Sequence, residues 1–188
     1  MQHMCEIEVI DKKVFPDFQE KFLADPKSGA CPFYHIGDKF TFRRYGDEDT
    51  FWTVGKGSQC AEAWDCISRY VYTALQGGSI MRNWTNDERM MIACCNDGTR
   101  PVIFKIRRID YFAVYIAGVK DSGCAGADEV DINAVKKVLS SLEGIISVEL
   151  PAGKNFFEVV IDSHNPNINV GKIRDELKNA GYTLEKID

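Results

Sequence analysis

The order of hydrophobic patterns in residues 111–188 is the feature that most limits what this chain can fold into. Apolar and polar residues alternate, as is typical of strands, at residues 112–119, 145–150, 156–162 and 182–187. Between these stretches, apolar residues recur three or four positions apart in two segments, one after Asp131 and one ending at Gly181. The predicted order is therefore strand, helix, strand, strand, helix, strand.

This order is that of the split βαβ unit, a ferredoxin-like βαββαβ sandwich. Right-handed crossovers place both of its helices on one face of a four-stranded antiparallel sheet. The carboxylate of Asp131 can cap the first helix, and Gly144 can end it. In the strand that follows, we expect one face to be shared by Ile146, Val148 and Leu150.

The region before Tyr111 predicts a separate small α+β domain. Strand patterns occur at residues 5–10, 39–43, 90–95 and 101–109. Ser58 can cap a helix over residues 59–76, whose expected core stripe is Ala61, Trp64, Ile67, Val71 and Leu75. The last two of these strands are predicted to form a hairpin across residues 96–100, where Asp97-Gly98 supplies the turn chemistry. We therefore predict an α+β protein with two domains, residues 1–110 and 111–188.

Charge and hydropathy narrow the range of partners. The net charge of −5 disfavours a nucleic acid or an anionic membrane surface. No apolar run approaches the roughly 20 residues that a membrane helix needs. The N-terminal residues lack the pattern of a secretion signal, so we expect a cytoplasmic location.

The chain has seven cysteines, and six of them precede Tyr111. An odd number without a secretion signal favours free thiols over a disulfide framework. Free cysteines are often small buried hydrophobes, and that interpretation stays open for every one of them.

Four cysteines of the N-terminal region are candidates for a shared site. Cys31 lies in a proline-flanked loop, and Cys60 lies where helix N–H groups and the helix dipole favour a thiolate. Cys94 and Cys95 point to opposite sheet faces, so one of them can meet Cys60. Three thiolates, joined by His35, would suit zinc, copper or another soft metal ion. A reactive thiol is the alternative role.

Cys124 is a fifth candidate metal ligand. It lies in a Gly- and Ala-containing loop and could coordinate a metal together with another chain. One thiolate cannot close a tetrahedral site by itself. The alternative is an ordinary loop thiol.

Motifs of catalysis are missing from the sequence. His3, His35 and His164 lie in no catalytic arrangement, and no zinc-protease, serine-hydrolase or phosphate-loop motif occurs. The sequence therefore favours a non-enzymatic protein, and a thiol-dependent enzyme stays open as the alternative.

The C-terminal region resembles the heavy-metal-associated family of copper-chaperone and metal-ATPase modules. The residues that carry the resemblance are Leu142–Val148, at a helix-to-strand joint, and Ala180–Tyr182. The resemblance implies the ferredoxin-like fold and, in the family, soft-metal binding through a Cys-x-x-Cys pair. Here the carboxylates of Asp128 and Asp131 stand where that pair would fall. Carboxylates prefer hard cations, although a helix cap and first-turn acids also explain them.

The N-terminal region resembles a small uncharacterised prokaryotic family. Its motifs occur here as Ala30–Pro32 with Gly37–Phe40, as Cys60–Trp64, and as Ala93–Val102. This resemblance implies no activity.

Three functions remain as hypotheses. The first is a non-enzymatic binding or regulatory protein that handles a soft metal ion. The second is a redox sensor or enzyme that uses the N-terminal thiols. The third is an assembly module in which exposed sheet edges pair two chains as a homodimer.

Overall fold

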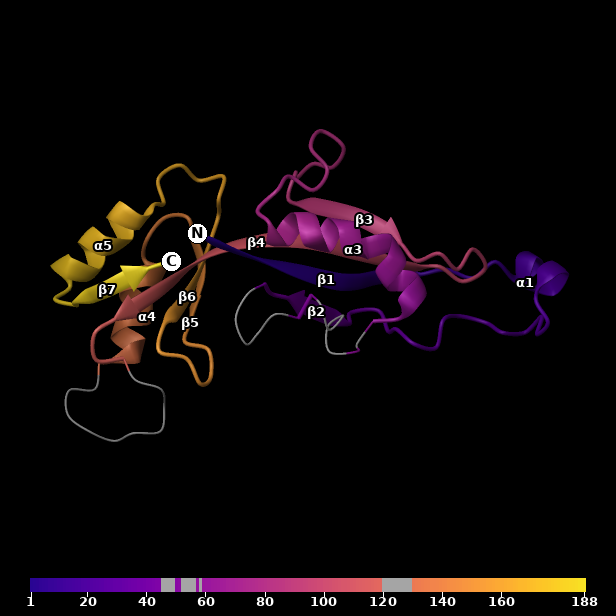
Figure 1. The fold of residues 1–188 in the computed structure, drawn as a ribbon, viewed down its shortest axis with the longest axis horizontal. Coiled ribbons are helices and arrows are strands. Elements are labelled where there is room, and N and C mark those ends of the chain that lie inside the picture. The colour runs from indigo at the N-terminus through magenta and orange to yellow at the C-terminus, as the bar shows by residue number, and fades with distance from the viewer. Residues whose placement is uncertain (45–49, 52–56, 58, 120–129) are drawn as a thin grey trace. The chain divides into compact units, whose positions relative to one another are not determined.

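The structure is a computed structural model that describes residues 1–44, 50–51, 57, 59–119 and 130–188 (Figure 1). The described residues form helices and an antiparallel sheet of seven strands, so the predicted α+β class is confirmed. Contacts divide the chain into two compact units, His3–Ile109 and Met1–Gln2 with Asp110–Asp188. Each unit has its own cluster of buried apolar side chains.

Strand β4 (Val102–Ile116) runs through the boundary between the units. The sequence predicted two strands here, at 101–109 and 112–119, with a break at Asp110-Tyr111, and that prediction is wrong. Asp110 pairs with Ile161 and Tyr111 pairs with Val160 of strand β6 (Phe157–Ile161), so the ladder continues through both residues.

In the unit His3–Ile109, strand β1 (Gln2–Lys12) lies between β4 and the short strand β2 (Lys39–Phe42). Cys5, Ile7 and Val9 are fully buried, as the alternating pattern predicts. Strand β3 (Met90–Cys94) pairs with β4 in an antiparallel hairpin that joins Cys94 to Ile103. The predicted hairpin is confirmed.

Helices α1 (Pro16–Phe22) and α3 (Ala61–Leu75) lie in the described part of this unit. Helix α1 begins with proline, which suits a first helical position. Helix α3 has Cys60 as its N-cap and packs on the core cluster through Ile67, Val71 and Leu75. The predicted cap, Ser58, lies outside the described residues.

The predicted stripe of α3 is wrong at Ala61, which is exposed. The helix begins at Ala61, and its first inward position is Ala63, which is fully buried. Trp64 is half-buried and its indole stacks on the Phe42 ring at 5.4 Å between centroids.

The other unit contains the second half of β4, the strand β5 (Ile145–Glu149), β6 and the strand β7 (Leu184–Ile187). Its strands follow the order β7-β4-β6-β5, and each neighbouring pair is antiparallel.

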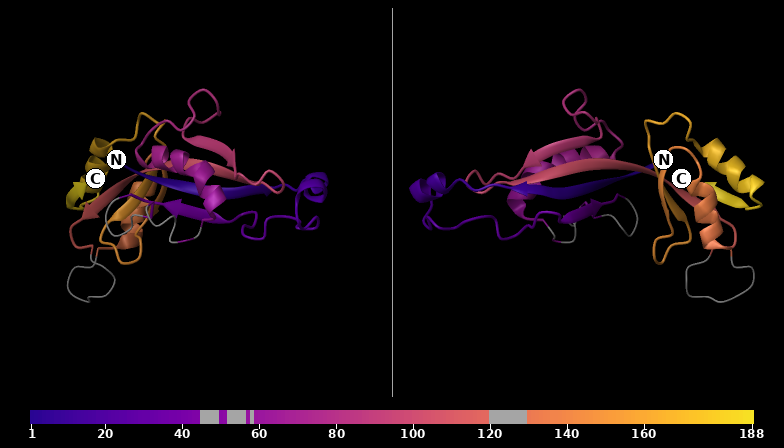
Figure 2. Two further views of the ribbon diagram at one scale, coloured as in Figure 1. Left: turned by 45° about the vertical axis from the view of Figure 1, so that its right-hand side comes forward. Right: turned by 180° about the vertical axis from the view of Figure 1, so that it is seen from behind.

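Helices α4 (Ile132–Ser140) and α5 (Val170–Asn179) contact each other and lie on the same side of β5 and β6 (Figure 2). The Asp131 carboxylate accepts hydrogen bonds from the backbone N–H groups of Asn133 and Ala134, so the predicted cap is confirmed. Val135, Leu139, Ile173 and Leu177 are fully buried in the core of this unit.

The face predicted for β5 is wrong at Ile146, whose side chain is 65% exposed. A register shift, typical of a β-bulge, lies between Ile145 and Ser147. The extra residue shifts the alternation, so Ile145 packs on the core in place of Ile146. Val148 and Leu150 pack on the core as predicted.

A candidate thiol-lined site

Three cysteines from separate segments line one cavity of about 330 Å³ in the unit His3–Ile109. Cys31 comes from the loop before β2, Cys60 caps α3, and Cys95 follows β3. All three are half-buried free thiols. We call this the thiol cavity, and its other walls include Phe33, Tyr34 and Val102.

Tyr34 holds the start of α3 against the loop. Its side chain is almost completely buried, and its ring meets the Phe104 ring edge-on at 5.3 Å between centroids. The hydroxyl accepts a hydrogen bond from the Cys60 N–H at 2.8 Å and donates to Gln59 Oε1 at 3.0 Å. Burial raises the pKa of Tyr34 to about 12, so the phenol keeps its proton.

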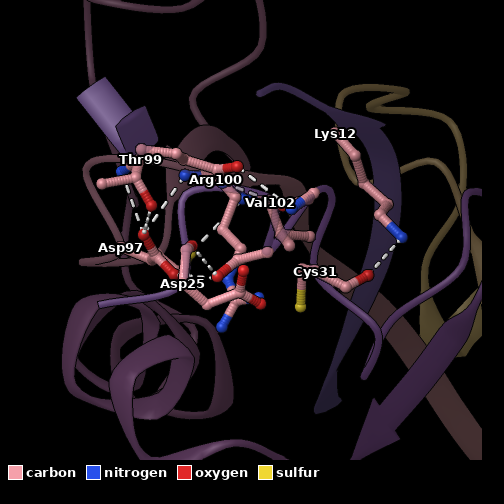
Figure 3. A network of polar contacts seen from close by, with 11 residues as sticks. Lys12, Asp25, Cys31, Asp97, Thr99, Arg100 and Val102 are labelled. Carbon is pink, nitrogen blue, oxygen red and sulfur yellow. Dashed lines mark hydrogen bonds and ion pairs between the residues drawn. The ribbon is translucent and has the colours of Figure 1, made fainter. Parts of the chain in front are cut away.

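Lys12 fixes the loop from the side of β1. Its Nζ donates to the backbone carbonyl of Cys31 at 2.6 Å (Figure 3). It also donates to the backbone carbonyl of Tyr34 at 2.7 Å. Hydrogen bonds from a charged donor are among the stronger ones, so this lysine ties Cys31 to the sheet.

The hairpin turn supplies the third wall. The Val102 N–H donates to Cys95 Sγ at 3.3 Å. Asp97 lies two residues after Cys95, and its carboxylate accepts three hydrogen bonds, each at 2.9 Å (Figure 3). The donors are the Thr99 N–H, the Thr99 hydroxyl and Arg100 Nε. Partial burial opposes ionisation of Asp97, but the bonds from Thr99 and Arg100 outweigh it and lower the pKa of the carboxyl. Asp97 therefore remains a carboxylate paired with Arg100 at neutral pH.

A second cavity, of about 500 Å³, lies beside α3 and β3 and is lined by Cys66, Cys94 and Cys95. Cys66 Sγ donates to Asn96 Oδ1 at 2.9 Å, and Asn96 Nδ2 donates to Asp65 Oδ2 at 2.8 Å. Burial raises the pKa of the Cys66 thiol, so this cysteine acts as a hydrogen-bond donor that holds Asn96.

The structure separates the two adjacent cysteines. Met91, Ala93 and Cys95 pack against the core, whereas Ile92 and Cys94 are exposed. Cys95 therefore joins Cys31 and Cys60, and Cys94 does not line the thiol cavity.

The predicted partner His35 does not line the cavity either. Its side chain is 80% exposed, and its Nδ1 lies 3.7 Å from Asp38 Oδ2. Cys124 and Asp128 lie outside the described residues. Within the described residues, no group of three or more His, Cys, Asp or Glu side chains is placed to hold a metal ion.

Sequence reasoning missed Tyr34 and the part that Asp97 plays in the cavity. Tyr34 follows a run of loop residues, and no local pattern marks a tyrosine there as a buried hydrogen-bonding centre. The turn chemistry of Asp97-Gly98 was visible, but the ion pair with Arg100 needs the folded turn.

Comparison of the chain with family models, with curated proteins and with solved structures found no match. Among the helices that the structure describes, none combines the length and the apolar content that crossing a membrane requires.

Proposed function

We propose that this chain is a non-enzymatic regulatory protein that binds a thiol-reactive ligand in the thiol cavity. The observation that carries the proposal is the meeting of Cys31, Cys60 and Cys95, from three distant segments, on one cavity of about 330 Å³. Small-molecule sites in proteins have volumes of roughly 300–1,000 Å³, so this cavity is large enough for a small ligand.

The three thiols that line the cavity are also accessible to solvent. Each of the three is half-buried, whereas Cys5 is fully buried and Cys66 is nearly so. Reactive cysteines are partly exposed, and inert structural cysteines are buried in apolar surroundings. A reversible modification of a cavity thiol would act directly on the loop tied by Lys12 and on the start of α3.

A soft metal ion is the second candidate ligand, with zinc or copper as the expected metals. Thiolates select Zn or Cu(I), and three cysteines line the same cavity. The heavy-metal-associated family that residues 111–188 resemble binds metal through a Cys-x-x-Cys pair that this chain lacks, so this second candidate rests on the three cysteines of the thiol cavity alone.

For the unit that contains Asp110–Asp188, we propose the ferredoxin-like fold. The order β7-β4-β6-β5 corresponds to fourth, first, third and second strand of a βαββαβ unit, with α4 and α5 on one side.

The test is the labelling rate of each cysteine in the native full-length protein, purified without air and treated with iodoacetamide. Peptide mass spectrometry reads each site separately. We expect Cys31, Cys60 and Cys95 to react roughly tenfold or more faster than buried Cys5, with exposed Cys94 as the upper reference. Labelling of all three as slow as that of Cys5 would overturn the proposal.

The metal candidate is tested on the same preparation. Elemental analysis after incubation with Zn²⁺ or Cu(I) and removal of excess ion should give one equivalent, and Cys31→Ser should lower it. Metal well below one equivalent removes this candidate.

A further inference from the structure

The charges on the wall of the thiol cavity decide which ligands it accepts. Among the described residues that line it, the charged side chains are Glu62, Asp97 and Arg100. Asp97 and Arg100 form an ion pair with 2.9 Å between Oδ2 and Nε, and each is about 70% buried. Their charges cancel at short range, so the arginine offers little net attraction to an anion.

Glu62 adds a negative charge at the rim. It lies in the first turn of α3, and its side chain is exposed. The wall as a whole therefore carries a slight excess of negative charge. A negatively charged ligand would lose hydration on entry and find no cation without a partner among these wall residues.

The rest of the cavity wall suits an apolar ligand. Pro32, Phe33, Val102 and the ring of Tyr34 contribute apolar surface. The Tyr34 hydroxyl already accepts from the Cys60 N–H and donates to Gln59. A ligand would therefore meet Tyr34 mainly as an apolar residue.

We propose that the thiol cavity takes small uncharged electrophiles of the conjugated-carbonyl class, such as enones and quinones, and that one of its thiols adds to them covalently. This inference rests on the proposed function and names its ligand class. The cysteine sulfur forms a bond to the β-carbon of the conjugated system, and the carbon–carbon π pair shifts toward the carbonyl. The proton that leaves the thiol ends on the resulting enolate, so the addition balances without an oxidant or a reductant.

The test compares two reagents with the same reactive head, N-ethylmaleimide and 3-maleimidopropionic acid, which is an anion at neutral pH. The native full-length protein is treated with each, and peptide mass spectrometry gives the rate at every cysteine. The ratio of the neutral to the anionic rate at Cys94, which lies outside the cavity, is the internal reference. We expect the ratio at the cavity thiols to exceed that reference roughly tenfold.

Two variants change the wall charge in opposite directions. Asp97→Asn leaves the charge of Arg100 uncompensated, so the preference for the neutral reagent should fall at the cavity thiols and stay unchanged at Cys94. Arg100→Gln removes the positive charge from the wall, so the preference of the cavity thiols for the neutral reagent should rise. Asp87→Asn is the matched control, because it breaks the ion pair with Arg89, which does not line the cavity.

The outcomes separate the two proposals. Cavity thiols that react as slowly as Cys5 with both reagents contradict the proposed function itself. Cavity thiols that react readily, but with the same ratio as Cys94, overturn the ligand class alone. An unchanged ratio in both wall variants, each checked for native circular dichroism, also overturns it.

Discussion

Cys5, Cys66 and Tyr34 each keep a proton that they would release more easily in water. Burial is the main cause in all three, and it raises the pKa of each group above its ordinary value. All three belong to the unit His3–Ile109, so the alkaline stability of this unit depends on them.

We expect the unit to lose stability as the pH rises above about 9. Above the ordinary thiol pKa of 9.0, the unfolded chain releases protons that the folded chain retains, so ionisation favours unfolding. The stabilisation is fully present below that pH, and the proton retained by Cys5 costs about 1.4 kcal/mol per further pH unit. Tyr34 adds its own loss only above its ordinary pKa of 10.0. Urea midpoints measured from about pH 8 to about pH 10.5 report the slope.

Cys5→Val should reduce this slope, because it removes one of the retained protons while filling a similar volume. Midpoints that stay level across the alkaline range would contradict the role of these groups.

The thiol cavity could be predicted only in part from the sequence. Strand alternation correctly separates Cys94 from Cys95, because successive side chains point to opposite faces. That Cys31 approaches Cys60 depends on Lys12 and Tyr34, which act across long sequence separations. No local pattern carries information of that kind.

At the scale of single elements, the ends of α4 and α5 are set by side-chain caps. Asp131 accepts from two N–H groups of the first turn of α4, and Asn169 accepts from the Lys172 N–H at the start of α5. Such caps satisfy donors that have no partner within the helix.

Asp131→Ala should therefore destabilise the unit that contains α4 by about 1 kcal/mol. The carboxylate accepts at 3.0 Å from Asn133 N and at 3.1 Å from Ala134 N, and alanine offers no acceptor. Chemical denaturation gives the free energy of unfolding. Asp131→Asn is the control and should stay close to the parent, because asparagine also caps well. Equal losses in both variants would show that the charge, and not the cap, matters.

Most elements could be predicted because the hydrophobic periodicity of the segment and the cap or turn residues at its ends indicate the same structure. The capped helix at Asp131 and the hairpin at Asp97 carry both signals. Prediction failed at Ile146, where one bulged residue shifts the alternation of β5, and at Asp110, where a polar residue continues a strand. Both failures arise because pairing with neighbouring strands overrides the local pattern.

At the scale of the whole molecule, β4 is the strand that both units use. Its first half lies next to β1 and β3, and its second half pairs with β6 and β7. Ile109 and Asp110, on either side of the boundary between the units, both belong to this one strand.

Backbone amides near this boundary should exchange slowly with deuterated solvent. The Arg108 N–H donates to the Arg89 carbonyl at 2.8 Å, and Asp110 and Tyr111 lie within the β4–β6 ladder. Hydrogen-exchange mass spectrometry of peptides covering residues 106–114 measures this protection. Exchange there as fast as in the turn at residues 97–100 would contradict a continuous strand.

Continuity of β4 has a consequence for how the gene can be divided. A fragment that stops at Ile109 would end in mid-strand, and one that starts at Asp110 would lack Gln2, whose side chain accepts from the Tyr111 hydroxyl. Neither fragment can therefore be moved into another protein by itself. A chimera that exchanges one of the two units must include the whole of β4.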